Sequence, residues 1–269
     1  MYGRRIRGLA VVIFLVVASY SMAHSEARDD GLMRFDFWSA TAAGMAGLCV
    51  LVAVSIAHGK GMSKKTKKIM MALYVVVIAG VTLYMAVGTV YLNFVSETGG
   101  PVHWHMDYEV WKCGEKLELP SQQGLDNKLG TPLLHTHYDD RIHAEGVIVH
   151  LQDADLDTFF AVIGGDLTKM SMAYPTGKGL VTAANGELCN GAAGKLQAFV
   201  YMAAGNVYWQ EKVDNFPSYV MSHNTNVPPG DCMIIEFGPE KNSSDKMCSS
   251  YRIAAEKGSI VKRGDVLGG

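Results

Sequence analysis

The chain has 269 residues, a formal net charge of −2 at pH 7 and an apolar fraction of 49%. This charge balance lacks the basic character that favours nucleic acid, so we expect no nucleic-acid partner. The length allows one or two domains. The apolar residues are concentrated in the first third, so the average composition hides a division between an apolar N-terminal part and a polar C-terminal part.

Residues 1–23 begin with three arginines, continue with an apolar core and end with small residues. This pattern is typical of a signal peptide that is cleaved after residue 23. It also fits an uncleaved first transmembrane helix, because the apolar stretch is near the short limit for spanning a bilayer. The sequence leaves both interpretations open.

Two longer apolar runs, residues 37–57 and 69–95, are each long enough to span a membrane. The basic loop between them, residues 58–68, carries five lysines and no acidic residue, whereas residues 25–36 carry four acidic residues and two arginines. The positive-inside rule therefore predicts that the loop is cytoplasmic and that the chain from about residue 96 onward is extracytoplasmic. We expect contact with the lipid bilayer of the cytoplasmic membrane.

Residues 101–238 alternate polar and apolar side chains over several short stretches, which predicts an α+β domain made mostly of strands. One packed helix is expected over residues 153–163, where apolar residues recur at helical spacing after an aspartate suited to an N-cap. A hairpin, this helix and the later strands would be compatible with a β-grasp-like sheet. Residues 239–269 read as a polar C-terminal segment.

Four of the five cysteines lie in the polar part of the chain, at Cys113, Cys189, Cys232 and Cys248. In an extracytoplasmic domain they predict two disulfides, for which three connectivities are possible. The chain has no Cys-x-x-Cys pair, which argues against a zinc site built from thiolates.

Six of the nine histidines fall within residues 101–150. They occur in three short patterns, which are His-Trp-His-Met-Asp from residue 103, Leu-His-Thr-His from residue 134 and Ile-His-Ala-Glu-Gly from residue 142. Alternate residues of a strand share a face, so imidazoles from several strands can converge on a copper or zinc ion. The predicted ligands are His105, His135, His137 and His143, with His103, Asp107 and Glu145 as further ligands or as partners that orient the imidazoles.

His150, at the end of a predicted strand, is interpreted as a structural histidine. The whole cluster has other interpretations, since grouped histidines can form a hydrogen-bonded, pH-sensitive element without a metal. A metalloenzyme with Glu145 or Asp107 as base is a further alternative, although the chain has no His-Glu-x-x-His or Gly-x-Ser-x-Gly motif.

The three histidine patterns, taken together over residues 101–149, resemble a family of membrane-anchored extracytoplasmic archaeal and bacterial proteins without an assigned activity. Residues 195–237 also look similar to membrane proteins of ammonia-oxidising archaea. The resemblance implies no catalytic residue or reaction. We therefore predict a membrane-anchored metal-binding protein, acting as an accessory subunit beside other membrane protein subunits of a metalloenzyme complex. The alternative is a structural, protein-interaction subunit.

Overall fold

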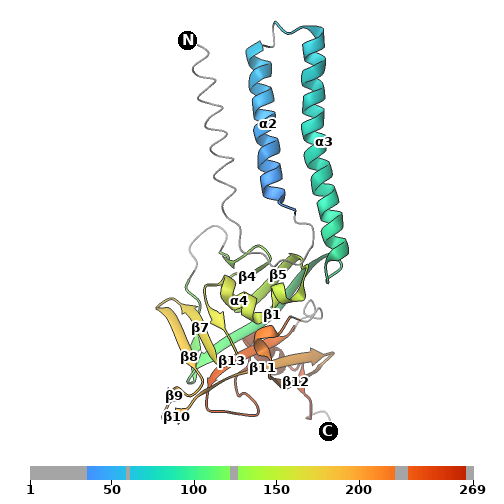
Figure 1. The fold of residues 1–269 in the computed structure, drawn as a ribbon. Helices are drawn as coiled ribbons and strands as arrows, with labels where there is room; N and C mark the ends of the chain where they lie inside the picture. The colour runs from blue at the N-terminus through green and yellow to red at the C-terminus, as the bar shows by residue number, and fades with distance from the viewer. Residues whose placement is uncertain (1–34, 59–60, 122–126, 222–229, 265–269) are drawn as a thin grey trace. The chain divides into compact units, whose positions relative to one another are not determined.

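The computed structural model describes residues 35–58, 61–121, 127–221 and 230–264. The segment 1–23, interpreted above as a signal peptide or a first transmembrane helix, lies outside the described residues. The chain forms two compact units that divide between Tyr91 and Leu92 (Figure 1). Each unit is described by itself.

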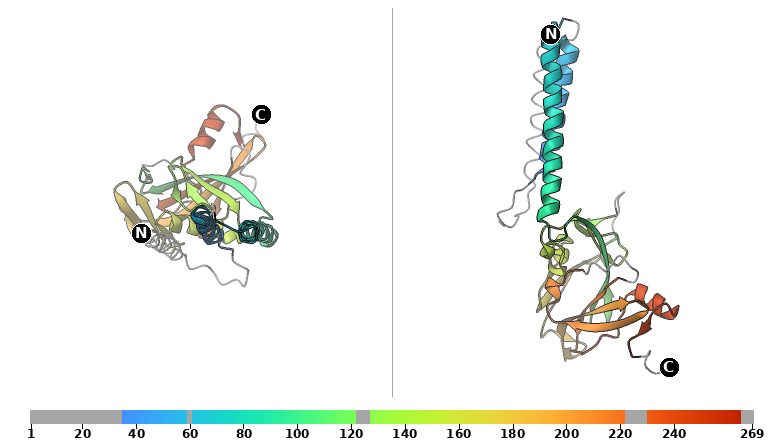
Figure 2. Two further views of the ribbon diagram at one scale, coloured as in Figure 1. Left: turned by 90° about the horizontal axis from the view of Figure 1, so that it is seen from above. Right: turned by 90° about the vertical axis from the view of Figure 1, so that its right-hand side faces the viewer.

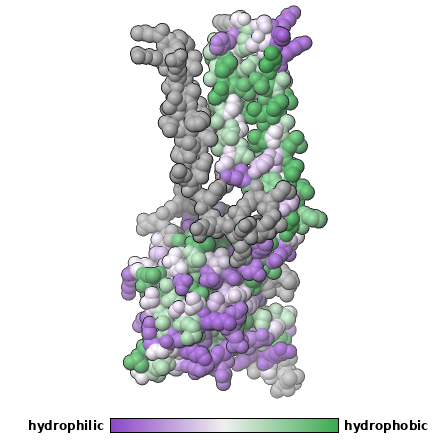
Figure 3. Space-filling model, viewed as in Figure 1, coloured by the Kyte–Doolittle hydropathy of each residue, from purple (hydrophilic) through white to green (hydrophobic). Residues whose placement is uncertain are grey.

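The first unit contains two long apolar helices, α2 (Phe37–His58, 22 residues) and α3 (Lys64–Val95, 32 residues). Both are long and apolar enough to cross a membrane, since about 20 apolar residues span the hydrocarbon layer. Their outer surface is largely hydrophobic, and hydrophilic side chains gather where the loop joins them (Figure 3). The two expected apolar helices are therefore confirmed, with α3 beginning inside the lysine loop.

Small and hydroxylated residues bring α2 and α3 together. A Cβ atom on Gly44 would lie 2.6 Å from a methyl group of Val81, so a larger side chain would push the helices apart. The hydroxyl groups of Ser55 and Tyr74 lie 3.2 Å apart near the other end of the pair. The helices run side by side in opposite directions (Figure 2).

The second unit is built on a nine-stranded, mixed and twisted sheet in the order β14-β12-β11-β13-β1-β5-β4-β3, with β2 paired to β1 (Figures 1 and 2). Two neighbouring pairs, β1 with β13 and β12 with β14, are parallel, and the others are antiparallel. The strands are β1 (Pro101–Lys112), β2 (Glu115–Leu117), β3 (Leu129–Gly130), β4 (Leu134–Thr136), β5 (Arg141–Val147), β11 (Lys195–Ala204), β12 (Val207–Val213), β13 (Cys232–Gly238) and β14 (Val261–Lys262). The mostly-β domain is confirmed, whereas the β-grasp arrangement is not.

The predicted helix is α4 (Leu156–Val162), and its N-cap is Asp155, whose carboxylate accepts a hydrogen bond from the Thr158 amide. It follows a short 3₁₀-helix, η2 (Leu151–Ala154). The ring of Phe159 packs against Tyr108 of β1 at 5.2 Å, inside the main hydrophobic core. One face of the sheet is thus covered by α4.

The prediction of a single packed helix was incomplete, because α5 (Ser249–Glu256) forms within the segment that reads as polar. Only Tyr251 of this helix is fully buried, so its sequence carries a weak apolar signal. Elements that sequence reasoning did not place are a three-stranded sheet, a short hairpin and a 3₁₀-helix, which are β6 (Asp166–Leu167), β7 (Ser171–Thr176), β8 (Gly179–Ala184), β9 (Leu188–Cys189), β10 (Ala192–Ala193) and η3 (Phe216–Ser218).

Two disulfides join Cys113 to Cys189 and Cys232 to Cys248. The prediction of two disulfides is confirmed, and the structure selects one of the three connectivities. The linked residues are 76 and 16 positions apart. Loop-closure entropy of the unfolded chain then gives about 4.5 and about 3 kcal/mol of stabilisation. The fifth cysteine, Cys49, is a free thiol in α2.

The start of β1 is fixed to the end of β5 by residues of the short polar linker. The Thr98 hydroxyl lies 3.3 Å from both the carbonyl oxygen and the amide of Ile148. The Glu97 carboxylate accepts a hydrogen bond of 2.8 Å from the Leu151 amide. These bonds hold the start of β1 beside the end of β5, the two strands that carry His103, His105 and His143.

Candidate metal centre

β1 separates its side chains cleanly between the two faces of the sheet. Trp104, Met106 and Tyr108 are buried in the main core beside α4. His103 and His105 alternate with these residues along β1. Their side chains therefore point to the opposite face, because strand side chains alternate. Met106 therefore points away from the histidines, into the main core.

Three neighbouring strands each place one histidine at the same level on this opposite face. In the antiparallel ladders, His143 of β5 is the register partner of His105 on β1 and of His135 on β4. Directly opposed side chains on one face are the closest neighbours that a sheet allows. The register therefore assembles a row of imidazoles across β4, β5 and β1.

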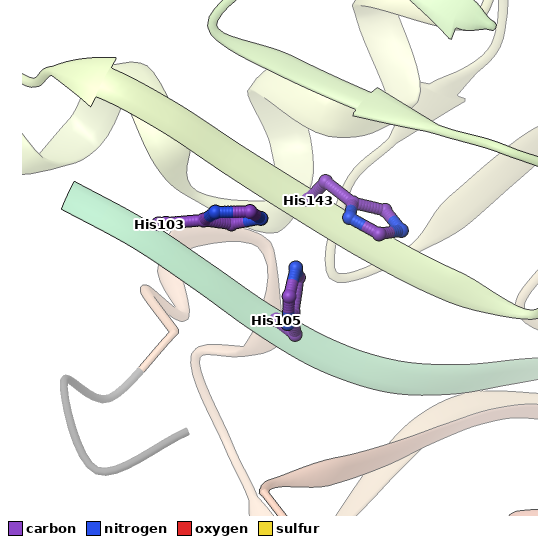
Figure 4. Close-up of side chains that lie close together, drawn as sticks. All are labelled: His103, His105 and His143. Carbon is purple, nitrogen blue, oxygen red and sulfur yellow. The ribbon is translucent and has the colours of Figure 1, made fainter. Parts of the chain in front are cut away.

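Two more histidines extend this row at its two ends. The ring of His103 lies 4.5 Å from that of His105, which lies 4.5 Å from that of His143 (Figure 4). At the other end, His137 follows β4 directly, and its ring lies 4.8 Å from His135 and 4.9 Å from His143. The histidine cluster, defined as these five residues, is one continuous group.

The histidine cluster contains two overlapping groups that can hold a metal ion. The outer triad is His103, His105 and His143, and the inner triad is His135, His137 and His143. Within each triad one ligand atom from each residue lies within 4.8 Å of the others. Nitrogens that share an ion at about 2 Å lie about 3–4 Å apart, so small side-chain rotations would complete either triad.

The triads differ in burial at one position, because they share His143 and because His105 and His137 are both partly exposed. The side chain of His103 is 63% exposed, whereas that of His135 is 0% exposed. Among the described residues, none offers a hydrogen bond to either ring nitrogen of His135 or to Nε2 of His105. A buried polar atom without a partner costs about 1–3 kcal/mol. These nitrogens are therefore the feature of the site that most needs a ligand.

A proton is a poor partner for the buried ring. Burial and, next, the nearby charge of Lys128 lower the pKa of His135 to about 4. Burial also lowers the pKa of His105, with His143 and His103 contributing next. Both imidazoles are therefore neutral near pH 7, which is the state in which a ring nitrogen can bind a metal.

Two other ring nitrogens have partners that fix the directions of their rings. Nε2 of His143 lies 3.1 Å from a carboxylate oxygen of Asp139, and Nδ1 of His137 lies 3.2 Å from the Asn127 carbonyl oxygen. If these nitrogens carry the proton and donate it, Nδ1 of His143 and Nε2 of His137 keep a free lone pair. Metal-binding histidines commonly have such a partner on the second nitrogen.

The charge of Asp139 supports the placement of the His143 proton on Nε2. Burial alone would raise its pKa, but the hydrogen bond and the charge of His143 lower the pKa overall. Asp139 is therefore ionised near neutral pH and suited to accept the His143 proton. Asp139 lies four residues before His143, and this short separation is the sequence signal that could have identified it. Asn127 gave no such signal, because it lies ten residues before His137 and nothing in its polar loop marks it as a partner.

The two predicted acidic ligands differ in position. Asp107 accepts a 2.6 Å hydrogen bond from the Arg141 guanidinium and belongs to neither triad. An oxygen of Glu145 lies 3.1 Å from Nε2 of His103 and 4.0 Å from Nε2 of His135. Glu145 thus stands between the outer and inner triads, whereas Arg141 already pairs with Asp107.

The remaining histidines of the described chain do not join the cluster. His150 lies at the N-cap of η2, outside both triads, in line with its expected structural role. The four cysteines of the domain form disulfides, so the described site offers nitrogen and carboxylate ligands. Such a set suits Zn²⁺ and Cu²⁺.

No protein-family model, curated protein or solved structure matches the chain. The resemblance of the three histidine patterns to a family of membrane-anchored proteins therefore stays a prediction. The site must be interpreted from its own geometry.

Proposed function

We propose that the protein is a membrane-anchored, extracytoplasmic metal-binding protein whose histidine cluster holds copper or zinc. The observation that carries this proposal is the ring of His135, which is 0% exposed and lacks a hydrogen-bond partner among the described residues. An ion on Nδ1 would use one lone pair. The N–H group at Nε2 could then donate a hydrogen bond to Glu145, whose oxygen is 4.0 Å away, after a small movement.

The exposure of the outer triad supports exchange of the ion rather than a purely structural role. Structural zinc sites are closed on all sides by protein ligands. Here His103 is mostly exposed. We propose that the domain receives and presents the ion, as an accessory subunit beside other membrane proteins.

Three features support the proposed topology. The helices α2 and α3 are long and apolar, and the loop that joins them is rich in lysine. The two disulfides of the second unit are typical of an oxidising compartment outside the cytoplasm. We propose that α2 and α3 span the cytoplasmic membrane and that the domain faces outward.

Cysteine labelling in intact cells tests this topology. In a Cys49→Ala background, Lys65→Cys reports on the loop and Glu256→Cys reports on the exposed side of α5. A membrane-impermeant maleimide is expected to label the Glu256→Cys variant and to label the Lys65→Cys variant only after lysis. The reverse pattern would overturn the proposed orientation.

Metal analysis of the full chain in detergent tests the binding. After treatment with a chelator, the protein is dialysed separately against Zn²⁺ and Cu²⁺, and the bound metal is measured by mass spectrometry. Wild type is expected to retain about one equivalent, since His143 is common to both triads. His135→Ala/His137→Ala is expected to retain little, whereas His150→Ala serves as the matched control. Equal metal contents in all three proteins would contradict the proposal.

A further inference from the structure

We propose that a single ion uses the two triads in succession, binding first at the outer triad and then moving to the inner triad. This inference rests on the proposed metal-binding function. It adds a pathway, a direction and a stoichiometry that follow from the arrangement of the five histidines.

Occupation by one ion at a time follows from the residue that the triads share. His143 belongs to both groups, and its Nε2 lies 3.1 Å from the Asp139 carboxylate. With Nε2 donating to Asp139, only Nδ1 keeps a lone pair, and one lone pair binds one ion. Two divalent ions held this close would also repel each other strongly across neutral imidazoles.

The direction follows from exposure. His103 is 63% exposed, the His143 side chain is 11% exposed, and His135 is 0% exposed. His105 and His137, the middle members of the two triads, are both partly exposed, so the most exposed ring, His103, makes the outer triad the entry point for an ion from solvent. Each triad holds a ring nitrogen without a partner among the described residues that an ion can bind, Nε2 of His105 in the outer triad and a nitrogen of His135 in the inner triad. The His135 ring is 0% exposed, so an unpartnered nitrogen costs most there and an ion gains more at the inner triad.

The spacing allows the ion to change triads without leaving the protein. His143 keeps its hold while the ion exchanges His103 and His105 for His135 and His137, whose rings lie 5.4 Å and 4.9 Å from that of His143. An oxygen of Glu145 lies between His103 and His135. Its carboxylate can bind the ion or offset its charge during the movement.

Rapid mixing of Co²⁺ with the chelator-treated full chain in detergent tests the order of binding. Wild type is expected to bind one equivalent in two absorbance phases, a first that depends on Co²⁺ concentration and a second that does not. His103→Ala is expected to slow loading at least about tenfold while preserving the final spectrum and the stoichiometry. His103 is exposed, so this variant is not expected to unfold.

His137→Ala tests the inner triad. It is expected to keep the first phase, to lose the second and to bind Co²⁺ at least about tenfold more weakly, because loss of a ligand costs at least as much as loss of a ligand's partner. His137→Asn is a second variant in case the alanine variant fails to fold, which circular dichroism would show. His150→Ala should follow wild type in both phases.

The outcomes separate this inference from the proposed function. Two equivalents in wild type, a single phase in wild type, or loading of His103→Ala at the wild-type rate would each overturn the two-position pathway and leave metal binding intact. Absence of Co²⁺, Zn²⁺ and Cu²⁺ binding in wild type would overturn both proposals.

Discussion

Two buried polar clusters lie on the same face of the large sheet, and their hydrogen bonds are completed in opposite ways. The histidine cluster spans β4, β5 and β1. The glutamate cluster, defined as Gln197, Glu236, Lys241, Ser244 and Asp245, lies on β11, β13 and the segment after β13. The strand registers place both on one face, since Trp111 of β1 opposes Glu236 and Gln197 of β11 opposes Glu236.

The glutamate cluster is satisfied by the chain itself. Glu236, only 3% exposed, accepts hydrogen bonds from the Lys241 ammonium at 2.6 Å and from the Ser244 hydroxyl at 3.0 Å. The buried Gln197 amide donates to the Pro239 carbonyl and accepts from the Lys241 amide. This fold therefore pairs its buried polar groups when a local segment can supply partners.

The histidine cluster differs because its most buried member has no such partner among the described residues. Buried nitrogens without a hydrogen-bond partner are therefore a property of the histidine cluster and not of the glutamate cluster on the same face. A buried group left without a partner costs stability, and a ligand from outside the chain can recover that cost. The following experiments test the contrast between the two clusters.

The largest effect is expected where a satisfied cluster is broken. Lys241→Met leaves the buried Glu236 carboxylate without its cation and is expected to lower the free energy of unfolding by about 3–5 kcal/mol. Denaturant titration measures this change. Lys195→Met, which removes a lysine paired with the exposed Glu240, should leave stability close to wild type. Equal losses in both variants would argue against a self-contained glutamate cluster.

Acid should destabilise the metal-free protein through His135. Its pKa is about 4 in the folded chain and near 6.5 in the unfolded chain. Between these values the unfolded chain binds the extra proton, so stability falls as the pH drops from about 6.5 to 4, by about 3 kcal/mol in total. Denaturation at several pH values, compared with His135→Leu, isolates this contribution. The same pH slope in both proteins would contradict it.

Metal should stabilise the protein against unfolding, and it should do so through the histidine cluster alone. Adding Zn²⁺ at a free concentration one hundred times the dissociation constant is expected to raise the free energy of unfolding by about 2.7 kcal/mol. Thermal or chemical denaturation of the chelator-treated chain gives the measurement. His135→Ala/His137→Ala should show no rise, whereas Lys241→Met should rise as wild type does. A rise in the double variant would place the ion elsewhere.

The smallest effect has opposite signs in the two clusters. His135→Leu removes polar atoms that lack a partner among the described residues, so the metal-free protein is expected to gain about 1 kcal/mol while losing metal binding. Gln197→Leu removes hydrogen-bonded groups and leaves their partners without hydrogen bonds, so it is expected to lower the free energy of unfolding by about 1–3 kcal/mol. Denaturant titration of both variants measures the signs. Destabilisation by His135→Leu would mean that the ring is already satisfied.

Much of the fold could be predicted from local pattern. The helices α2 and α3 are long apolar runs, and β1, β11 and β13 show the expected strand patterns. The helix α5 could not be predicted in the same way, because it is short, polar on average and fully buries only Tyr251. The parallel pairing of β1 with β13 depends on contacts between distant segments, which no local pattern encodes.

The candidate site shows the same limit. Alternation along β1 and β4 could place the histidines on one face, and Glu145 could be suspected because it lies two residues from His143. The row across three strands depends on the register between strands, which cannot be derived from the alternation along any one of them. The pairing of Asp107 with Arg141 depends on that register too, since these residues oppose each other across β1 and β5.

The position of β1 in the sheet also sets the order in which the domain can be assembled. One edge of β1 pairs with β5 and β2, which follow it closely in the chain, and the other pairs with β13, which is synthesised much later. Strands β1, β4 and β5 can therefore bring the histidines together while the other edge of β1 still lacks its partner. Unpaired edges invite wrong pairing with other chains. Rapid synthesis of the last third of the chain would therefore protect the domain from aggregation.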